Sequence, residues 1–269
     1  MSASKLGLLL GVLARDPREF ADRVRAVLEV RADRWLGRPE AYPTQPWPDL
    51  LRGLGATLGV DAAGFDREVD ESGIEARLAE GVTALGASPG IALRHNADTR
   101  IARLCYIACR ALRPQTVVET GVAYGVTTTF VLTALERNGH GQLHSIDLPP
   151  LAHDADDLVG RLVPHSLRSR WTLHRGASRR VLPALLARLG TLDVFIHDSL
   201  HTSRNMAFEF ELAHRHRASR FALLADDIEQ NGAFAAYARQ TRATLAFEAT
   251  CAASTKDGRA GACVLLARA

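Results

Sequence analysis

The feature that most constrains the fold is an alternation of short apolar strands with longer helical segments from residue 97 onward. A helix is expected over Ala97 to Leu112, and each strand candidate is separated from the next by a segment long enough for a helix. Strands alternating with helices at this spacing predict a doubly wound, mostly parallel sheet. The parallel strands are expected at Thr116 to Glu119, Gln142 to Ile146, Trp171 to His174, Leu192 to Ile196 and Phe221 to Ala225.

The alternation changes at the end of the chain. Ala243 to Thr250 and Ala262 to Ala267 lie on either side of Lys256-Asp257-Gly258, with no helix between them. They are predicted to form an antiparallel pair at one edge of the sheet. The expected architecture is an α/β fold with a seven-stranded, Rossmann-like sheet and an antiparallel C-terminal hairpin.

The first third of the chain has a different pattern. Asp16-Pro17 is expected to open a helix that runs through Trp35, with an acidic cap and a proline in the first turn. Shorter helices are expected from about Pro48 to Leu58 and from Ile74 to Leu85. We therefore divide the chain into an N-terminal helical cap or accessory region, residues 1–95, and a cofactor-binding domain, residues 96–269.

Composition limits the partners and the compartment. The 269 residues suffice for one to two domains, and a net charge of +3 is too small to indicate a nucleic-acid partner. The apolar run Leu6 to Leu13 is far shorter than the roughly 20 residues of a membrane-spanning helix and has no convincing signal-peptide cleavage site. Cys105 and Cys109 are expected to be apolar filling on one helix face. No membrane span and a cytoplasmic location are expected.

Lysine is almost absent. Of the 33 basic residues only Lys5 and Lys256 are lysines. Histidines, acidic residues and the few cysteines must therefore supply any proton transfer near neutral pH.

The first strand of the alternation leads into a glycine-bearing turn. In the stretch from Val117 to Thr128, Gly121 allows a tight turn, and Gly125 allows a ligand or a neighbouring backbone to approach the helix N-terminus. Ala123 and Tyr124 interrupt the GxGxxG spacing that is typical of a dinucleotide site. Glu119 would repel a phosphate but would suit a ligand with an amino group.

A second acidic residue, Asp147, ends the next strand. There it can accept both hydroxyls of a ribose. Glu119, the two glycines and Asp147 together describe a cationic nucleoside, S-adenosylmethionine. The alternative is that Glu119 and Asp147 only cap the helices that follow them.

Three further carboxylates follow the fourth and fifth strands. Asp198 comes after Leu192 to Ile196, and Asp226 and Asp227 come after Phe221 to Ala225. Because the carboxyl ends of neighbouring parallel strands open onto one crevice, these carboxylates are expected to converge and to bind a hard cation such as Mg²⁺. The alternative is that one aspartate holds the cofactor or caps a helix while the others face solvent.

At this point the chain resembles the class I S-adenosylmethionine-dependent methyltransferases, in the branch with an E-x-G-x-x-x-G-x-[ST] first motif. The resemblance covers about Ala97 to Ala269 and implies a Rossmann-like methyltransferase fold. It implies that Gly176, Ala177 and Ser178 lie at the adenine edge. The cofactor contacts of the first motif, of the second strand and of the fourth strand would then be Glu119, Gly121, Ala123, Tyr124, Gly125, Thr127, Asp147 and Asp198.

The carboxylate cluster is similar to that of metal-dependent small-molecule O-methyltransferases of the catechol and sugar-modifying types. The acid-acid pair Asp226-Asp227 resembles that of some sugar and macrolide enzymes. The catechol type has a lysine base three residues beyond its first metal-binding acid, and here that position is His201. We expect His201 to be the base, with Asp198 as the second choice. The alternative is that His201 caps the helix that begins near Thr202. His197 could then support the site without contacting the substrate.

The expected function is Mg²⁺-dependent O-methylation of a small polar acceptor such as a sugar, a glycoside or a polyketide-type natural product. A nicotinamide-dependent oxidoreductase is the first alternative, which the interrupted glycine spacing and the lack of a YxxxK pair disfavour. A non-catalytic binding protein with the cofactor fold is the second. Homodimerisation is one way to bury the apolar faces of the N-terminal helices.

Overall fold

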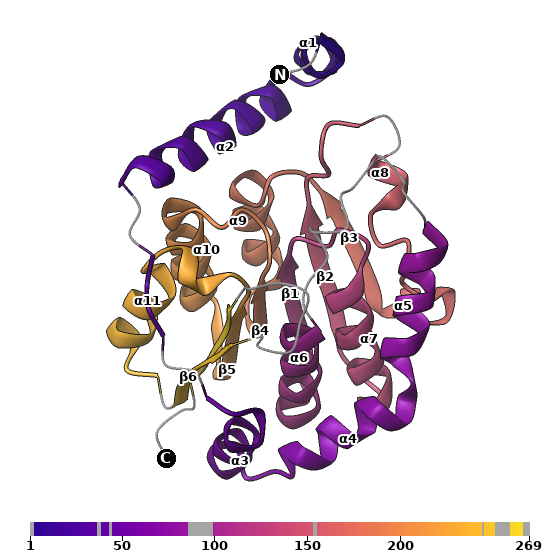
Figure 1. The fold of residues 1–269 in the computed structure, drawn as a ribbon, viewed down its shortest axis with the longest axis vertical. Helices are drawn as coiled ribbons and strands as arrows, with labels where there is room; N and C mark the ends of the chain where they lie inside the picture. The colour runs from indigo at the N-terminus through magenta and orange to yellow at the C-terminus, as the bar shows by residue number, and fades with distance from the viewer. Residues whose placement is uncertain are drawn as a thin grey trace.

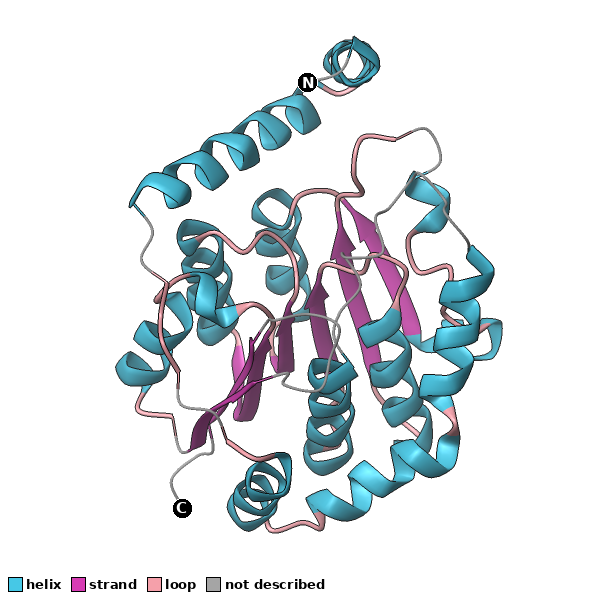
Figure 2. Ribbon diagram, viewed as in Figure 1, coloured by secondary structure: helices cyan, strands magenta, loops and turns pink. Residues whose placement is uncertain are grey.

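In the computed structural model the chain forms an α/β fold, with a central sheet between two layers of helices (Figure 1). The structure describes residues 3–36, 39–42, 45–85, 99–152, 155–243, 245–250 and 259–265. The predicted α/β class is confirmed by five parallel strands with helices on both faces (Figure 2).

The central sheet contains seven strands. They are β1 (Thr116–Thr120), β2 (Gln142–Asp147), β3 (Trp171–Arg175), β4 (Leu192–His197), β5 (Arg217–Ala225), β6 (Leu245–Thr250) and β7 (Arg259–Leu265). Their spatial order is β3-β2-β1-β4-β5-β7-β6, in which β7 pairs antiparallel with both β5 and β6. The strand order reverses between β1 and β4, so the loops that follow these two strands lie side by side at the carboxyl edge.

Side chains of alternate residues along the strands divide the core in two. Val117 of β1 packs in a cluster with α6 (Thr99–Leu112) and α7 (Val126–Asn138). Its neighbour Val118 packs on the opposite face, as expected from the twofold side-chain period of a strand. That face is covered by α9 (Ser178–Leu189), α10 (Ser203–Arg215) and α11 (Ala233–Thr241). Shorter segments are α8 (Ala155–Leu158), η2 (His165–Arg170) and η3 (Ile228–Gln230).

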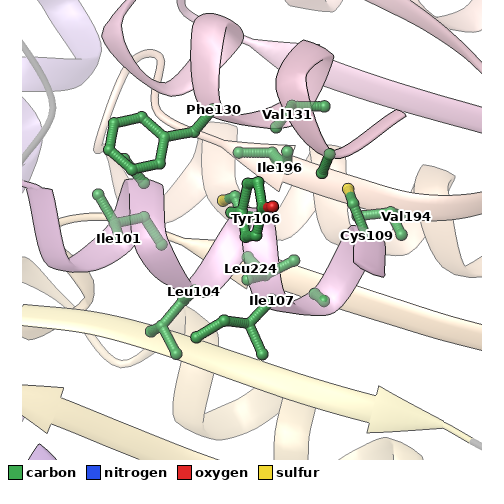
Figure 3. Close-up of a cluster of buried hydrophobic side chains, with 14 of the residues drawn as sticks. Ile101, Leu104, Tyr106, Ile107, Cys109, Phe130, Val131, Val194, Ile196 and Leu224 are labelled. Atoms are coloured by element: carbon green, nitrogen blue, oxygen red, sulfur yellow. The ribbon is translucent and has the colours of Figure 1, made fainter. Parts of the chain in front are cut away.

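Helix α6 lies inside the molecule. Tyr106, Ile107 and Cys109 of α6 are buried in the same cluster as Phe130 of α7 and Ile196 of β4 (Figure 3). Cys105 and Cys109 are both free and fully buried, and burial raises the pKa of each thiol above its ordinary value. The two cysteines therefore fill the core, as predicted.

The N-terminal helices have two different placements. α1 (Ala3–Arg15) and α2 (Pro17–Leu36) lie at the carboxyl edge of the sheet, and the first turn of α2 is capped by the Asp16 carboxylate as predicted (Figure 1). α3 (Trp47–Leu58), α4 (Ala62–Ser72) and α5 (Ile74–Leu85) contribute to the same core cluster as α6. The sequence prediction missed α4, which is closed at its ends by Asp61 and Gly73.

Several predicted features fall on residues that are not described. The boundary between residues 95 and 96, the start of the helix at Ala97, the turn at Lys256 and Cys251 lie outside the described residues. Among the helices that are described, none has the length and apolar character needed to cross a membrane.

Candidate functional site

The turn after β1 is packed against the loop after β4. Gly121 has a φ of +86°, and a Cβ at this position would lie 1.8 Å from the backbone oxygen of Asp198. The amide of Asp198 also donates a hydrogen bond of 2.7 Å to the carbonyl of Thr120. Only glycine suits this conformation and this close approach, and the contact places Asp198 directly beside the turn.

The second glycine of the turn accommodates a neighbouring segment. Gly125 has a φ of +91°, and a Cβ there would lie 2.8 Å from Val163 Cγ2 and 3.0 Å from Gly160 Cα. The amide of Gly160 donates to the carbonyl of Ala123 at 2.9 Å. Of the two uses that the sequence left open for Gly125, the structure shows approach of a neighbouring backbone. Ala123 is partly exposed, whereas the side chain of Tyr124 is fully buried.

Glu119 lies completely buried at the end of β1. Its Oε2 accepts hydrogen bonds from the hydroxyls of Ser145, at 2.6 Å, and Thr128, at 2.8 Å. Its Oε1 is buried and has no hydrogen-bond partner among the described residues. Burial raises the pKa of Glu119 to about 7, against the lowering effect of the two hydroxyls. The site thus contains a carboxyl oxygen that lacks a partner and would be stabilised by a cationic donor.

The N-terminus of α7 has a second buried group of this kind. The hydroxyl oxygen of Thr127, in the first turn, is buried and has no hydrogen-bond partner among the described residues. The residue that precedes the helix, Gly125, provides no side-chain cap. The first amides of a helix and its positive dipole end attract anions, so this turn suits a carboxylate.

Asp147 supports the glycine turn from the end of β2. Its Oδ2 accepts hydrogen bonds from the amides of Val122, at 2.7 Å, and Ala123, at 3.0 Å. Burial raises the pKa of Asp147, although both amides act in the opposite direction. Asp147 therefore does not cap the following helix, which was one of the two predicted roles.

The loop after β3 continues the same edge. The amide of Gly176 donates to the carbonyl of Asp147 at 2.8 Å, and Gly176 has a φ of +148°. Ala177 is the N-cap residue of α9 and is partly exposed. Ser178 is hydrogen-bonded to the buried Glu209 of α10. The structure thus brings Gly176 and Ala177 next to Asp147, while the Ser178 side chain interacts with α10.

Beyond β4 and β5, a histidine lies between two carboxylates. His201 Nε2 is 3.7 Å from Asp198 Oδ1 and 3.7 Å from Asp227 Oδ2. Asp227 has a positive φ of +51°, and its Oδ2 also accepts a hydrogen bond from Gln230. Asp226 is buried, and its amide donates to the carbonyl of His197. The loops after β4 and β5 thus converge as the sequence predicted.

This arrangement does not support the predicted magnesium site. Within the described ranges, no group of three or more His, Cys, Asp or Glu side chains is placed to hold a metal ion. The imidazole of His201 lies near both carboxylates, with Nε2 3.7 Å from Asp198 Oδ1 and 3.7 Å from Asp227 Oδ2. We therefore assign no step of the reaction to a metal.

A buried His–Glu pair lies behind this cluster. His197 Nδ1 is 2.7 Å from Glu209 Oε2, and both side chains are completely buried. Glu209 also accepts hydrogen bonds from Thr120, Ser199 and Asn205. The sequence analysis missed Glu209. The available signal was an acidic residue within a largely apolar stretch of helix, which is rare unless the acid is paired.

Helix α2 crosses the carboxyl edge and is held by polar contacts. Its buried Glu19 pairs with Arg175 at the end of β3, and its buried Glu29 accepts from the Thr202 hydroxyl at 3.1 Å. Asp22 and Asp33 of α2 contact Arg180 and the amide of Ser203. A cavity of about 300 Å³ remains between α1, α2 and the loop after β2.

Residues 118–228 match the model of a protein family described as a methyltransferase domain. These residues are therefore similar to the methyltransferase domain that the family model describes. The matched segment contains Glu119, the glycine turn, Asp147 and the three aspartates of the later loops. The methyltransferase assignment made from the sequence is therefore confirmed. None of the curated proteins compared with this chain matches it.

Solved structures show the same fold for the methyltransferase domain and its surroundings. An O-methyltransferase from Bacillus cereus, in complex with S-adenosylhomocysteine, is similar with a TM-score of 0.52 at 14% identity, covering 74% of this chain and 96% of that chain. A Klebsiella pneumoniae protein provisionally assigned as an O-methyltransferase has a TM-score of 0.51 at 16% identity, covering 76% and 96%. At these identities the likeness shows the class I methyltransferase fold.

Proposed function

We propose that the protein transfers a methyl group from S-adenosylmethionine to a hydroxyl oxygen of a small polar acceptor, with His201 as the general base. The observation that carries the proposal is the position of His201 Nε2, 3.7 Å from the carboxylates of both Asp198 and Asp227. Asp198, whose carboxylate faces this imidazole, contacts Gly121 of the glycine turn through its backbone. This contact supports a proton acceptor close to the cofactor turn.

Groups that lack partners support the cofactor assignment. The cofactor's amino-acid carboxylate would be held by the α7 N-terminus and the Thr127 hydroxyl, and its ammonium group by Glu119 Oε1. Both hydrogen bonds to Asp147 end on Oδ2, which leaves Oδ1 to accept from a ribose hydroxyl. When bound, S-adenosylmethionine supplies an electrophilic methyl carbon, which the acceptor oxygen attacks as the carbon–sulfur bond breaks.

The proton is handled by the chain's own residues. His201 Nε2 accepts the proton of the acceptor hydroxyl, and the carboxylates of Asp198 and Asp227 stabilise the imidazolium that forms. Asp198 remains the alternative proton acceptor. Because both carboxylates are partly exposed, they also offer hydrogen-bond acceptors to the further hydroxyls of a sugar, a glycoside or a polyketide-type product.

The N-terminal helices would complete the acceptor site. In this proposal α1 and α2 act as the cap, since α2 contacts the ends of β3 and the start of α10. The outer surface of the two helices carries Leu10, Val27, Leu28 and Trp35 as exposed apolar side chains. Contact with a second copy of the chain would cover them.

The test is a screen of hydroxylated acceptors with labelled S-adenosylmethionine, using wild-type protein, His201→Ala and His165→Ala. Loss of a general base predicts a rate about tenfold lower or more in His201→Ala. Affinity for S-adenosylhomocysteine should stay unchanged in this variant. His165, an exposed histidine in η2, is the matched control. Methylation by His201→Ala at the wild-type rate would remove His201 from the mechanism.

A further inference from the structure

The Glu209–His197 pair is buried deeply enough to require an explanation. Both side chains are completely inaccessible, and their oxygen and nitrogen are 2.7 Å apart. Leaving a carboxylate and an imidazole in the core is unfavourable unless both are well paired. Neither side chain contacts solvent, so the pair has no role at the surface.

Glu209 is held in one orientation by donors from several elements. Oε2 accepts from the hydroxyl of Thr120 in β1 at 2.7 Å as well as from His197. Oε1 accepts from the Ser199 hydroxyl at 3.0 Å and from the Asn205 amide at 2.9 Å. Burial tends to raise the pKa of Glu209, but His197 and the hydroxyl donors lower it below its ordinary value. Glu209 is therefore an ionised acceptor with no freedom to rotate.

This carboxylate fixes the imidazole of His197. Because an ionised carboxylate only accepts hydrogen bonds, His197 Nδ1 carries the proton. The fixed ring of His197 contacts His201: the two rings meet edge to face, with ring centroids 5.2 Å apart at 90°. His197 also contacts Phe210 at 82°, so its ring is enclosed on a further side.

We infer that Glu209 and His197 are positioning residues that fix the orientation of the His201 imidazole toward the acceptor. The inference rests on the proposed function, in which His201 is the base. Glu209 holds His197, and His197 limits the rotation of His201, so that His201 Nε2 stays between Asp198 and Asp227. When a general base is held within a narrow range of orientations, less of the reaction rate is lost to misalignment.

The first experiment compares Glu209→Gln with Glu211→Gln. Glu211 lies on the same helix, is exposed and pairs with Arg215, so it is the matched control. Glu209→Gln should lower kcat about tenfold and leave KM for S-adenosylmethionine nearly unchanged, whereas Glu211→Gln should behave as wild type. A loss that appears only in KM for S-adenosylmethionine would overturn the inference. Ser199→Ala, which removes one donor to Glu209, should give a smaller fall in kcat if Glu209→Gln does not fold.

A double-mutant cycle separates positioning from a general effect on stability. In the His201→Ala background, Glu209→Gln should cause no further loss, because the residue that it positions is absent. An equal loss in both backgrounds would contradict the inference.

The nitrogen resonances of labelled histidine give a readout that does not need turnover. Glu209→Gln should shift the His201 imidazole signals, and unchanged signals would overturn positioning. Equal activity of His201→Ala and wild type would instead refute the proposed base, whatever the resonances show.

Discussion

At the scale of single residues, the site depends on backbone contacts that only glycine permits. Gly121→Ala should destabilise the protein by at least about 3 kcal/mol and weaken binding of S-adenosylhomocysteine at least tenfold. The reason is the 1.8 Å approach of its Cβ to the Asp198 backbone oxygen. Thermal unfolding and calorimetry measure both effects.

Gly139→Ala is the control for the backbone conformation alone. Gly139 also has a positive φ, +76°, but nothing lies within 4 Å of its Cβ position. Its substitution should cost about 1–2 kcal/mol and leave binding intact. Equal losses of stability in the two variants would show that the contact with Asp198 is unimportant.

The raised pKa of Glu119 predicts how cofactor affinity depends on pH. Because burial raises the pKa of Glu119 to about 7, this carboxyl is mostly neutral at pH 6 and mostly ionised at pH 8. An ammonium group binds the ionised carboxylate. Affinity for S-adenosylhomocysteine should therefore rise roughly tenfold from pH 6 to pH 8, as the ionised fraction rises. Titration calorimetry across this range measures it. Glu119→Gln should bind more weakly and without this pH dependence; a pH dependence retained in Glu119→Gln would assign the effect to another group.

Residue positions were easier to predict from the sequence than residue contacts. Glu119, Asp147 and Asp198 lie at the strand ends where the sequence placed them, because parallel strands bring their carboxyl ends to one edge. His197 was named in one alternative as a residue that supports the site, but its partner Glu209 was missed, since the pair depends on how α10 packs against β4. Asp147 binds the glycine turn through amides that no side-chain pattern reveals.

At the scale of elements, α2 is predicted to cover the carboxyl edge of the sheet and to be held there mainly by ion pairs and charged hydrogen bonds. Replacing both Glu19 and Glu29 with glutamine removes the pairing with Arg175 and Arg179. Hydrogen exchange should then increase across residues 17–36, and KM for the acceptor should rise several-fold. Asp49→Asn, at an exposed pair on α3, should change neither. Unchanged exchange in the double variant would show that these contacts do not hold α2 in place.

Strands and helices agree with the sequence prediction to within a few residues where apolar patterns mark them. β5 begins at Arg217 rather than at Phe221, because the four residues before Phe221 are mostly exposed and carry no apolar pattern. α4 was missed because only Ala62 and Val69 of this helix are buried, so it carries little apolar pattern. Turn and cap geometry, rather than hydrophobic periodicity, sets both boundaries.

At the scale of the whole molecule, the proposed reaction assigns the acceptor's proton to His201 and gives no step to a metal ion. His201 Nε2 lies 3.7 Å from an oxygen of Asp198 and 3.7 Å from an oxygen of Asp227. Methyl transfer by the wild-type protein should therefore persist in excess EDTA, with a rate within about twofold of the untreated enzyme. A rate that collapses with EDTA and returns with Mg²⁺ would restore the metal site predicted from the sequence.

The central claim is that the carboxyl edge of this sheet binds S-adenosylmethionine. The most direct measurement is titration calorimetry with S-adenosylhomocysteine and, separately, NAD⁺. We predict saturable binding of S-adenosylhomocysteine at one site per chain, weakened at least tenfold by Gly121→Ala, and no binding of NAD⁺. Tight binding of NAD⁺ without binding of S-adenosylhomocysteine would contradict the account.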